Sequence, residues 1–287
     1  MKIGFIGLGL MGFPMAENVL KKSQPENFTV WNRTVEKSNS FKRANPSSTI
    51  GSSPSDVANK SDVVILVLTD DNANEQVMTD LIQANNSTLT VINMSTITPE
   101  KSIELHNKVR AKGFRYIEAP VSGTIGPAKQ GTLKIYTGGV KELNDEMQSM
   151  LLTMGDQVFY IGEIGKASVI KLLINSNLAV YMSILSETLI AGEHLGLDKG
   201  KFLDIINGGI IATVASKLKG PNVLKDNFSV AFPFEHMLKD MSYSLSLLDS
   251  EKMPLVDVVK KQYESGLNAE KGKDFSAIFN YYKTLYE

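Results

Sequence analysis

The sequence predicts an α/β protein in which a doubly wound parallel sheet is followed by an all-α domain, the two joined by one long helix. Up to residue 162, apolar strand segments alternate with helical segments, as they do in open parallel sheets. Beyond that point no strand pattern recurs, and the stretch from Lys166 to Ala191 contains neither Gly nor Pro. We therefore expect two domains, residues 1–162 and 163–287.

Composition restricts the class of function. The chain has 287 residues, a formal net charge of -1, no cysteine and three histidines without metal-ligand spacing. A net charge this close to zero gives no excess of positive charge for binding nucleic acid or an anionic membrane, so neither is expected as a partner. Disulfides and thiolate chemistry are excluded, and no metal cofactor is expected. We read no segment as a signal peptide or as a bilayer span, which makes a cytoplasmic location the default expectation.

The N-terminal segment carries a nucleotide-binding pattern. A buried strand over Lys2–Ile6 runs directly into G-x-G-x-x-G, and a helix with Pro14 in its first turn is predicted from about Met11 to Lys22. In this setting the first glycine permits a tight turn, the second lets a pyrophosphate approach the backbone, and the third allows close helix packing. The pattern predicts a Rossmann domain, with a plain glycine-rich turn as the alternative. The residues expected to bind the cofactor here are Gly7, Leu8, Gly9, Leu10, Met11 and Gly12.

The end of the second predicted strand, Phe28–Trp31, indicates which dinucleotide is bound. An NAD site would place a carboxylate here to accept a hydrogen bond from the ribose 2′-hydroxyl. The chain instead has Asn32, Arg33 and Thr34, whose donors suit a 2′-phosphate. An ordinary polar turn, with Thr34 capping the next helix, is the alternative. We expect NADP(H) to be preferred over NAD(H).

Two further strands are predicted over Asp62–Leu68 and Leu89–Met94, each followed by a helix, over about 73–84 and 99–112. Ligands of open α/β sheets bind beyond the carboxyl ends of the strands. This places four residues at the cofactor cleft: Leu68, Thr69, Ser95 and Thr96. Any of these hydroxyls could instead cap a local helix, and for Ser95 a cap is the expectation.

Later segments complete the predicted architecture. A strand over about 114–118 leads into Ser122-Gly123-Thr124, which is either a carboxylate-binding nest or a plain turn. Strands over 132–137 and 157–161 flank a helix over about 141–154. In the second domain we expect loops at 208–209 and 219–221, and a helix over 234–248.

The long helix presents three polar residues on one face. Ser168, Lys171 and Asn175 recur at i, i+3 and i+7, whereas most other positions are apolar. A buried ammonium is costly unless it meets water, a partner or a ligand. Lys171 therefore either belongs to a site or reaches the surface or an acidic partner.

Together these stretches resemble the β-hydroxyacid dehydrogenase family, which includes 3-hydroxyisobutyrate dehydrogenases and the glyoxylate, succinic-semialdehyde and tartronate-semialdehyde reductases. Residues 7–18 are similar to the family's cofactor signature, 118–123 to its substrate motif and 162–175 to its catalytic motif. Lys239-Asp240 resembles the late motif whose lysine reaches cofactor and substrate. The resemblance covers essentially the whole chain, in order.

The resemblance implies hydride transfer between a nicotinamide and a small hydroxy acid or semialdehyde, such as glyoxylate, succinic semialdehyde or 3-hydroxyisobutyrate. Lys171 then stands at the position of the general acid/base, and Asn175 at that of its companion amide. The implied substrate-binding residues are Ser122, Gly123, Thr124, Lys171, Asn175 and Lys239, and Lys239 also reaches the cofactor. The helical domain is expected to bind substrate and to assemble the chain into a homodimer or homotetramer.

Three positions depart from the family's pattern. Thr124 stands where a second glycine is usual, Asn93 replaces a common acid, and Ala167 replaces a glycine. None of them removes a catalytic group, although Thr124 bears on the substrate pocket.

Rival functions share this architecture. A non-catalytic NADP(H)-binding sensor and an imine reductase both tend to lack the lysine that this chain keeps at Lys171. A 6-phosphogluconate-type enzyme normally has a longer helical domain.

Overall fold

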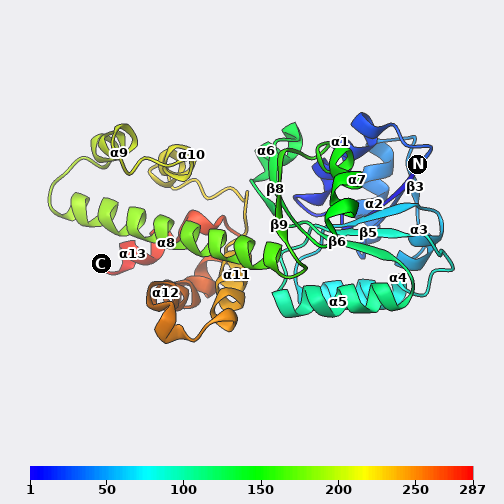
Figure 1. Ribbon diagram of the computed structural model, residues 1–287. Helices are drawn as coiled ribbons and strands as arrows, with labels where there is room; N and C mark the ends of the chain where they lie inside the picture. Colours follow the sequence, from blue (N-terminus) through cyan, green and yellow to red (C-terminus); the bar gives the residue numbers. More distant parts are fainter. Residues whose placement is uncertain (287) are drawn as a thin grey trace. The chain divides into compact units, whose positions relative to one another are not determined.

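The computed structural model describes residues 1–286, and contacts divide the chain into two compact units, Met1–Lys171 and a second that begins at Leu172 (Figure 1). The division falls inside one continuous helix, α8 (Lys166–His194), which therefore begins in one unit and ends in the other.

The first unit is built on a single sheet with strand order β3-β2-β1-β4-β5-β6-β8-β7, and β9 pairs with β8. Neighbours from β3 to β6 run parallel, β8 is antiparallel to β6 and β7, and β9 is parallel to β8. The strand order reverses between β1 and β4, the point at which such sheets bind ligands. The strands are β1 (Lys2–Ile6), β2 (Asn27–Trp31), β3 (Thr49–Ile50), β4 (Val63–Leu66), β5 (Thr90–Asn93), β6 (Arg115–Glu118), β7 (Val121–Ser122), β8 (Leu133–Gly138) and β9 (Gly155–Gly162).

Helices cover both faces of this sheet (Figure 1). One apolar core forms against α1, α2, α6 and α7, and another against α3, α4 and α5. Strands β4 and β5 are buried along their whole length, as expected of strands covered on both faces. The predicted doubly wound sheet is confirmed. The helices are α1 (Gly12–Ser23), α2 (Val35–Ala44), α3 (Pro54–Asn59), α4 (Asp71–Leu81), α5 (Pro99–Ala111), α6 (Ile125–Gln130) and α7 (Lys141–Leu151).

The glycines after β1 set how closely α1 approaches the sheet. Gly7 has φ +100°, a conformation that L side chains rarely adopt. A Cβ on Gly12 would lie 1.9 Å from the carbonyl oxygen of Gly7, whereas a Cβ on Gly9 would meet no atom within 4 Å. Gly7 and Gly12 are therefore required by the fold itself, and Gly9 leaves open space above the loop.

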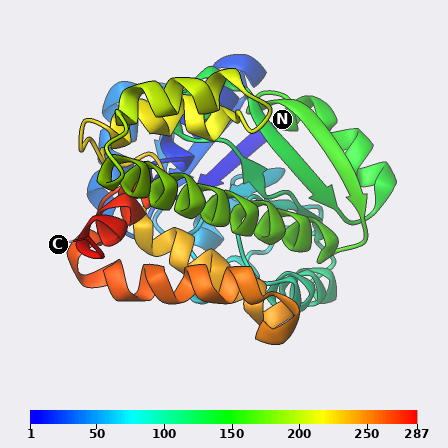
Figure 2. The same cartoon turned by 90° about the vertical axis from the view of Figure 1, so that its left-hand side faces the viewer.

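The second unit is helical, and α8 runs through it with α9 and α10 on one side and α11 to α13 on the other (Figures 1 and 2). Ala179, Met182, Leu185 and Leu189 of α8 pack into the core of this unit. Within residues 172–286 no strand is present apart from one isolated bridge, in agreement with the predicted all-α domain. The further helices are α9 (Lys199–Gly208), α10 (Val214–Val223), α11 (Phe234–Leu247), α12 (Pro254–Glu270) and α13 (Ile278–Thr284), with 3₁₀ turns η1 (Ser250–Lys252) and η2 (Phe275–Ala277).

Two sequence predictions in this half are wrong. Residues 219–221, predicted as a loop, lie inside α10, where Gly220 packs so closely on Leu203 that an added Cβ would lie 2.7 Å from it. Lys219 of the same turn forms an ion pair with buried Asp274 at 2.7 Å, so tertiary contacts override the local Gly-Pro signal.

The expectation that no segment is apolar enough to span a bilayer is also wrong, because the length and composition of α8 meet that criterion. An 18-residue window of α8 has a mean hydropathy of 1.5, and half of that window is buried. A helix in the core of a protein passes the same test.

The glycine geometry predicts that Gly12→Ala lowers the free energy of unfolding of the first unit by roughly 2 to 3 kcal/mol or more, because the added methyl group meets backbone. Trp31 is the single tryptophan and lies in this unit, so urea unfolding followed by its fluorescence measures the change. Gly9→Ala is the matched control and should alter stability by about 1 kcal/mol at most. Equal losses in the two variants would contradict this account of the loop.

Candidate functional site

A cavity of about 460 Å³ opens at the carboxyl ends of β1, β2 and β4, where the sheet predicts a ligand site. It is lined by predicted cofactor residues from three segments of the chain: Gly7, Gly9, Asn32, Arg33, Thr34, Leu68 and Thr69. Other predicted residues do not line it: Leu8, Leu10, Met11, Gly12 and Thr96. Leu8 is buried beneath the loop, and Gly12 supports the loop through helix packing. The cavity includes the open glycine, Gly9, at which a pyrophosphate can approach the backbone, whereas the first residues of α1 do not line it.

The side chain of Asn32 is used within the chain. Its Oδ1 accepts a hydrogen bond from the Leu8 amide at 2.9 Å, and its Nδ2 donates to the Thr34 carbonyl oxygen at 3.0 Å. Asn32 thus joins the end of β2 to the glycine loop. It holds the shape of the pocket, which leaves neighbouring side chains to contact a phosphate.

Arg33 and Lys37 are the exposed cations at this end of the cavity. Sequence reasoning named Arg33 and missed Lys37. The signal was present, because Lys37 lies in the first turn of α2, three residues after Thr34. Thr34 occupies the N-cap position of α2 without making a side-chain capping bond.

Hydrogen bonds of Ser95 and Asn93 join the segments that follow β4 and β5 at the cavity. Ser95 Oγ accepts a hydrogen bond from the Leu68 amide at 2.9 Å, so β4 ends at Leu66 and not at Leu68 as predicted. The expectation that Ser95 caps a helix is wrong, because Thr98 caps α5. Asn93, the unusual residue at the end of β5, accepts from the Ser95 amide through Oδ1 at 3.1 Å. Its Nδ2 donates to Asn74 of α4 at 2.9 Å, a bond for which an amide supplies the donor.

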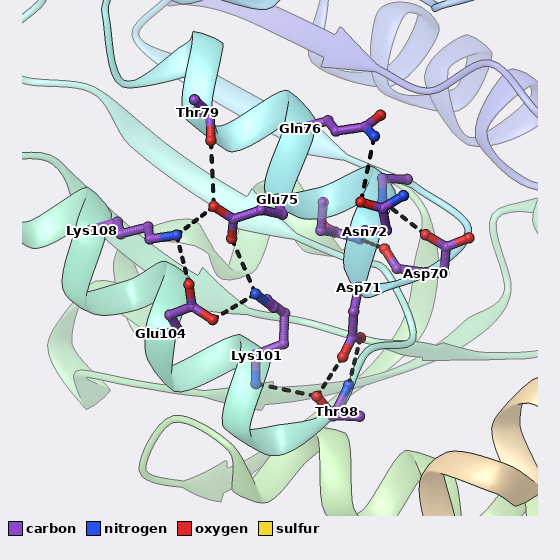
Figure 3. Close-up of polar contacts among 12 residues, drawn as sticks. Asp70, Asp71, Asn72, Glu75, Gln76, Thr79, Thr98, Lys101, Glu104 and Lys108 are labelled. Atoms are coloured by element: carbon purple, nitrogen blue, oxygen red, sulfur yellow. Dashed lines mark hydrogen bonds and ion pairs between the residues drawn. The ribbon is translucent and has the colours of Figure 1, made fainter.

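Helix α4 lines the cavity with one face and is held to α5 by the other (Figure 3). The Asp71 carboxylate accepts hydrogen bonds from the Thr98 amide at 3.0 Å and from the Thr98 hydroxyl at 2.6 Å. Glu75 forms ion pairs with Lys101, at 3.1 Å, and with Lys108. These contacts fix the helix that carries Gln76 and Val77 along the cavity wall.

Lys171 lies near the start of α8, and its Nζ is 3.4 Å from the Ser122 hydroxyl. Ser122 ends β7, and Gly123 follows it with φ +137°, which favours glycine. Thr124 then precedes α6 in an extended conformation and makes no side-chain capping bond. The structure thus brings the predicted catalytic lysine to the predicted substrate motif within the first unit.

Glu118, the last residue of β6, binds the first turn of α8. Its carboxylate accepts hydrogen bonds from the amides of Gly165, at 2.7 Å, and Ser168, at 2.8 Å, and also from the Ser168 hydroxyl. Burial raises the pKa of the Glu118 carboxyl, while the bonds from Ser168 and Gly165 act in the opposite direction.

In the second unit, Asp240 joins the two other predicted site residues. One oxygen, Oδ2, accepts from Asn175 Nδ2 at 2.6 Å, and the other lies 2.8 Å from Lys239 Nζ. Lys239 also lies over the ring of Tyr243, 4.5 Å from its centroid. Asp240 was noted in the sequence only as the neighbour of Lys239. Its role in orienting Asn175 could not be read from spacing, because the two residues are 65 positions apart.

Comparison with known proteins agrees with this geometry. Residues 2–162 match the family model of the NAD-binding domain of 6-phosphogluconate dehydrogenase, and residues 165–282 match the model for the NAD-binding domain of NADP-dependent 3-hydroxyisobutyrate dehydrogenase. Glyoxylate/succinic semialdehyde reductase 1 of Arabidopsis thaliana is 33% identical over 284 residues, which cover 97% of each chain.

Two other similarities mark the breadth of the group. The cytokine-like nuclear factor N-PAC of Xenopus tropicalis is 30% identical over 98% of this chain but only 53% of its own length. A structure of 3-hydroxyisobutyrate dehydrogenase from Mycobacterium tuberculosis with L-serine superposes with a TM-score of 0.87, covering 100% of this chain and 99% of that one at 23% identity. The family models, together with the Arabidopsis reductase, show that the chain belongs to the β-hydroxyacid dehydrogenase family of NAD(P)-dependent oxidoreductases.

Proposed function

We propose that the protein is an NADP(H)-dependent reductase of small carboxylate-bearing aldehydes of the glyoxylate and succinic semialdehyde class, with Lys171 as the general acid. The observation that carries the proposal is the 3.4 Å approach of Lys171 Nζ to Ser122 Oγ. It joins a proton donor to a hydroxyl of the motif that resembles a substrate-binding segment. The Arabidopsis reductase, similar over its whole length, is named for both aldehydes.

The chemistry follows from charge. Bound NADPH would supply a hydride to the carbonyl carbon. As the new C–H bond forms, the electron pair of the carbonyl π bond moves to the oxygen, whose negative charge the Lys171 ammonium stabilises before giving that oxygen a proton. Lys171 then regains a proton from water, and in the oxidative direction the same amine accepts the proton.

Other residues hold the substrate in place. Ser122 and the amides of Gly123 and Thr124 are assigned to the substrate carboxylate, which leaves the carbonyl free to face Lys171. Asn175 follows Lys171 by one turn of α8, so both point to the same side of that helix. Asp240 orients Asn175 and Lys239 within the second unit. A contact of Lys239 with cofactor and substrate stays a prediction from the family resemblance. The homo-oligomeric state and the cytoplasmic location also stay predictions, the first from the apolar surfaces of the helical domain and the second from the sequence pattern.

Turnover assays test the proposed function directly. Loss of NADPH absorbance is measured with glyoxylate, succinic semialdehyde and a phosphorylated sugar acid in parallel, at matched concentrations. Activity with the first two alone supports the proposal. Tight NADPH binding without turnover of any of them would instead favour a sensor related to the nuclear factor.

The assignment of Lys171 predicts that Lys171→Ala lowers kcat by about 100-fold or more, because both charge stabilisation and proton transfer are lost. The dissociation constant for NADPH should stay near the wild-type value, since Lys171 is not among the residues of the cofactor cavity. Binding is followed through energy transfer from Trp31. Lys166→Ala, an exposed lysine on the same helix, is the control and should keep full activity. A near-wild-type kcat for Lys171→Ala would refute the assignment.

The cofactor preference predicts different outcomes for neighbouring residues. Arg33→Ala and Lys37→Ala should each raise the dissociation constant for NADPH by about 10-fold or more, because each removes a charged partner of the 2′-phosphate. The affinity for NADH should change far less. Asn32→Ala should weaken the binding of both cofactors, because it removes the hydrogen bond that joins the Leu8 amide of the glycine loop to the end of β2. Titration of each variant with both cofactors measures the ratio of the two dissociation constants. Equal losses of affinity for NADPH and NADH in the Arg33 variant would contradict the proposed preference.

A further inference from the structure

The N-terminus of α8 is held differently from those of α4 and α5, while α1, α2 and α7 have no side-chain cap. Helices α4 and α5 are capped by the residue that immediately precedes them, Asp70 and Thr98 respectively. The first amides of α8 are instead bound by Glu118, which lies 47 positions before Gly165 and 50 before Ser168. A helix needs no distant residue merely to satisfy its amides, since a local Ser or Asp does so.

The carboxylate of Glu118 is confined. Its side chain is buried, and both oxygens are bound by the first turn of α8. The backbone of Glu118 pairs with Gly138 of β8, where a Cβ would lie 2.7 Å from Oε2. A buried carboxylate is costly unless its hydrogen bonds are made. The carboxylate thus faces the positive end of the helix dipole, with hydrogen bonds to both of its oxygens.

The Glu118 contact lies close along the chain to the approach of Lys171 to Ser122. Ser168 precedes Lys171 by three residues on one helix face, and Glu118, the last residue of β6, precedes Ser122, the last residue of β7, by four residues. Two contacts thus connect the β6–β7 segment with the start of α8. One is the hydrogen-bonded pair Glu118–Ser168, and the second is the pair Lys171–Ser122. At 3.4 Å the second pair is at the outer limit of a hydrogen bond, so a small shift of α8 would separate it.

We infer that Glu118 is a positioning residue, which holds the first turn of α8 so that the Lys171 ammonium faces the Ser122 hydroxyl and the substrate bound there. The inference rests on the proposed role of Lys171. Glu118 itself need not contact substrate or cofactor. Its contribution is to the orientation of the proton donor, which a misplacement of about 1 Å can reduce 100-fold.

The test is a double-mutant cycle between Glu118→Gln and Lys171→Ala. Glutamine keeps the shape of Glu118 but replaces one oxygen with an NH₂ group, which cannot accept a hydrogen bond from α8. We expect kcat to fall by about 10- to 100-fold while NADPH affinity is kept. In the Lys171→Ala background the same change should produce no further loss in single-turnover rate with excess enzyme. Glu146→Gln, an exposed glutamate paired with Arg115, is the matched control and should leave kcat unchanged.

The outcomes are distinguishable. An unchanged kcat for Glu118→Gln, or an equal loss in both backgrounds, would overturn the inference while leaving the role of Lys171 intact. A fully active Lys171→Ala enzyme would remove the proposed function itself, and this inference with it. Should Glu118→Gln fail to fold, Ser168→Ala serves in its place, because it removes one hydroxyl and keeps the two backbone bonds. It should lower kcat with NADPH binding intact and show the same non-additivity with Lys171→Ala.

Discussion

The buried carboxylate of Glu118 against the first turn of α8 is the contact on which the arrangement of the candidate site depends. It joins the end of a central strand to the helix that carries Lys171, and it lies four residues before Ser122. A carboxylate among helix amides is favoured by the dipole and by its hydrogen bonds, whereas burial opposes the charged form. The contact uses both carboxylate oxygens, which favours a fixed position for the helix turn that precedes the proposed proton donor.

The cavity of the first unit is built from two kinds of residue: those that hold its shape and those that are exposed to a ligand. Gly7 and Gly12 allow α1 to approach the sheet, and Asn32 holds the glycine loop through both ends of its amide. Gly9 instead leaves open space, and Arg33 lies exposed at the cavity. The supporting residues are fixed by backbone contacts, while the contacting residues remain accessible to a ligand. The two kinds of residue alternate along the same short motifs, so a motif alone does not distinguish them.

The sequence predicted those parts of the fold whose pattern is long enough to repeat. The central strands and the helix containing Lys171 were predicted with the correct type, because apolar runs and the absence of Gly and Pro persist over many residues. Strand β3 and helix α6 were missed, since elements of two to six residues give no periodicity. The loop predicted at 219–221 was wrong because packing on Leu203 and an ion pair to Asp274 stabilise a helix there.

Within the site, local motifs could be predicted and distant partners could not. Lys171 and Ser122 were each found in a motif, and the structure brings them together. Ser95 was misassigned, because its partner is the amide of Leu68, two residues beyond the end of β4, and not a neighbouring helix. Glu118 and Asp240 were visible as motif residues, but their roles depend on partners 47 to 65 positions away. Spacing along one element carries no information about such contacts.

The proposed reaction requires that the amino group of Lys171 meet the substrate oxygen at which charge develops. A crystal structure of the protein with NADP⁺ and a small hydroxy acid bound would measure this directly. We expect Lys171 Nζ to lie about 3 Å from the substrate hydroxyl oxygen, with the substrate carboxylate against Ser122. A complex in which that ammonium points to bulk solvent, away from the nicotinamide ring, would contradict the account.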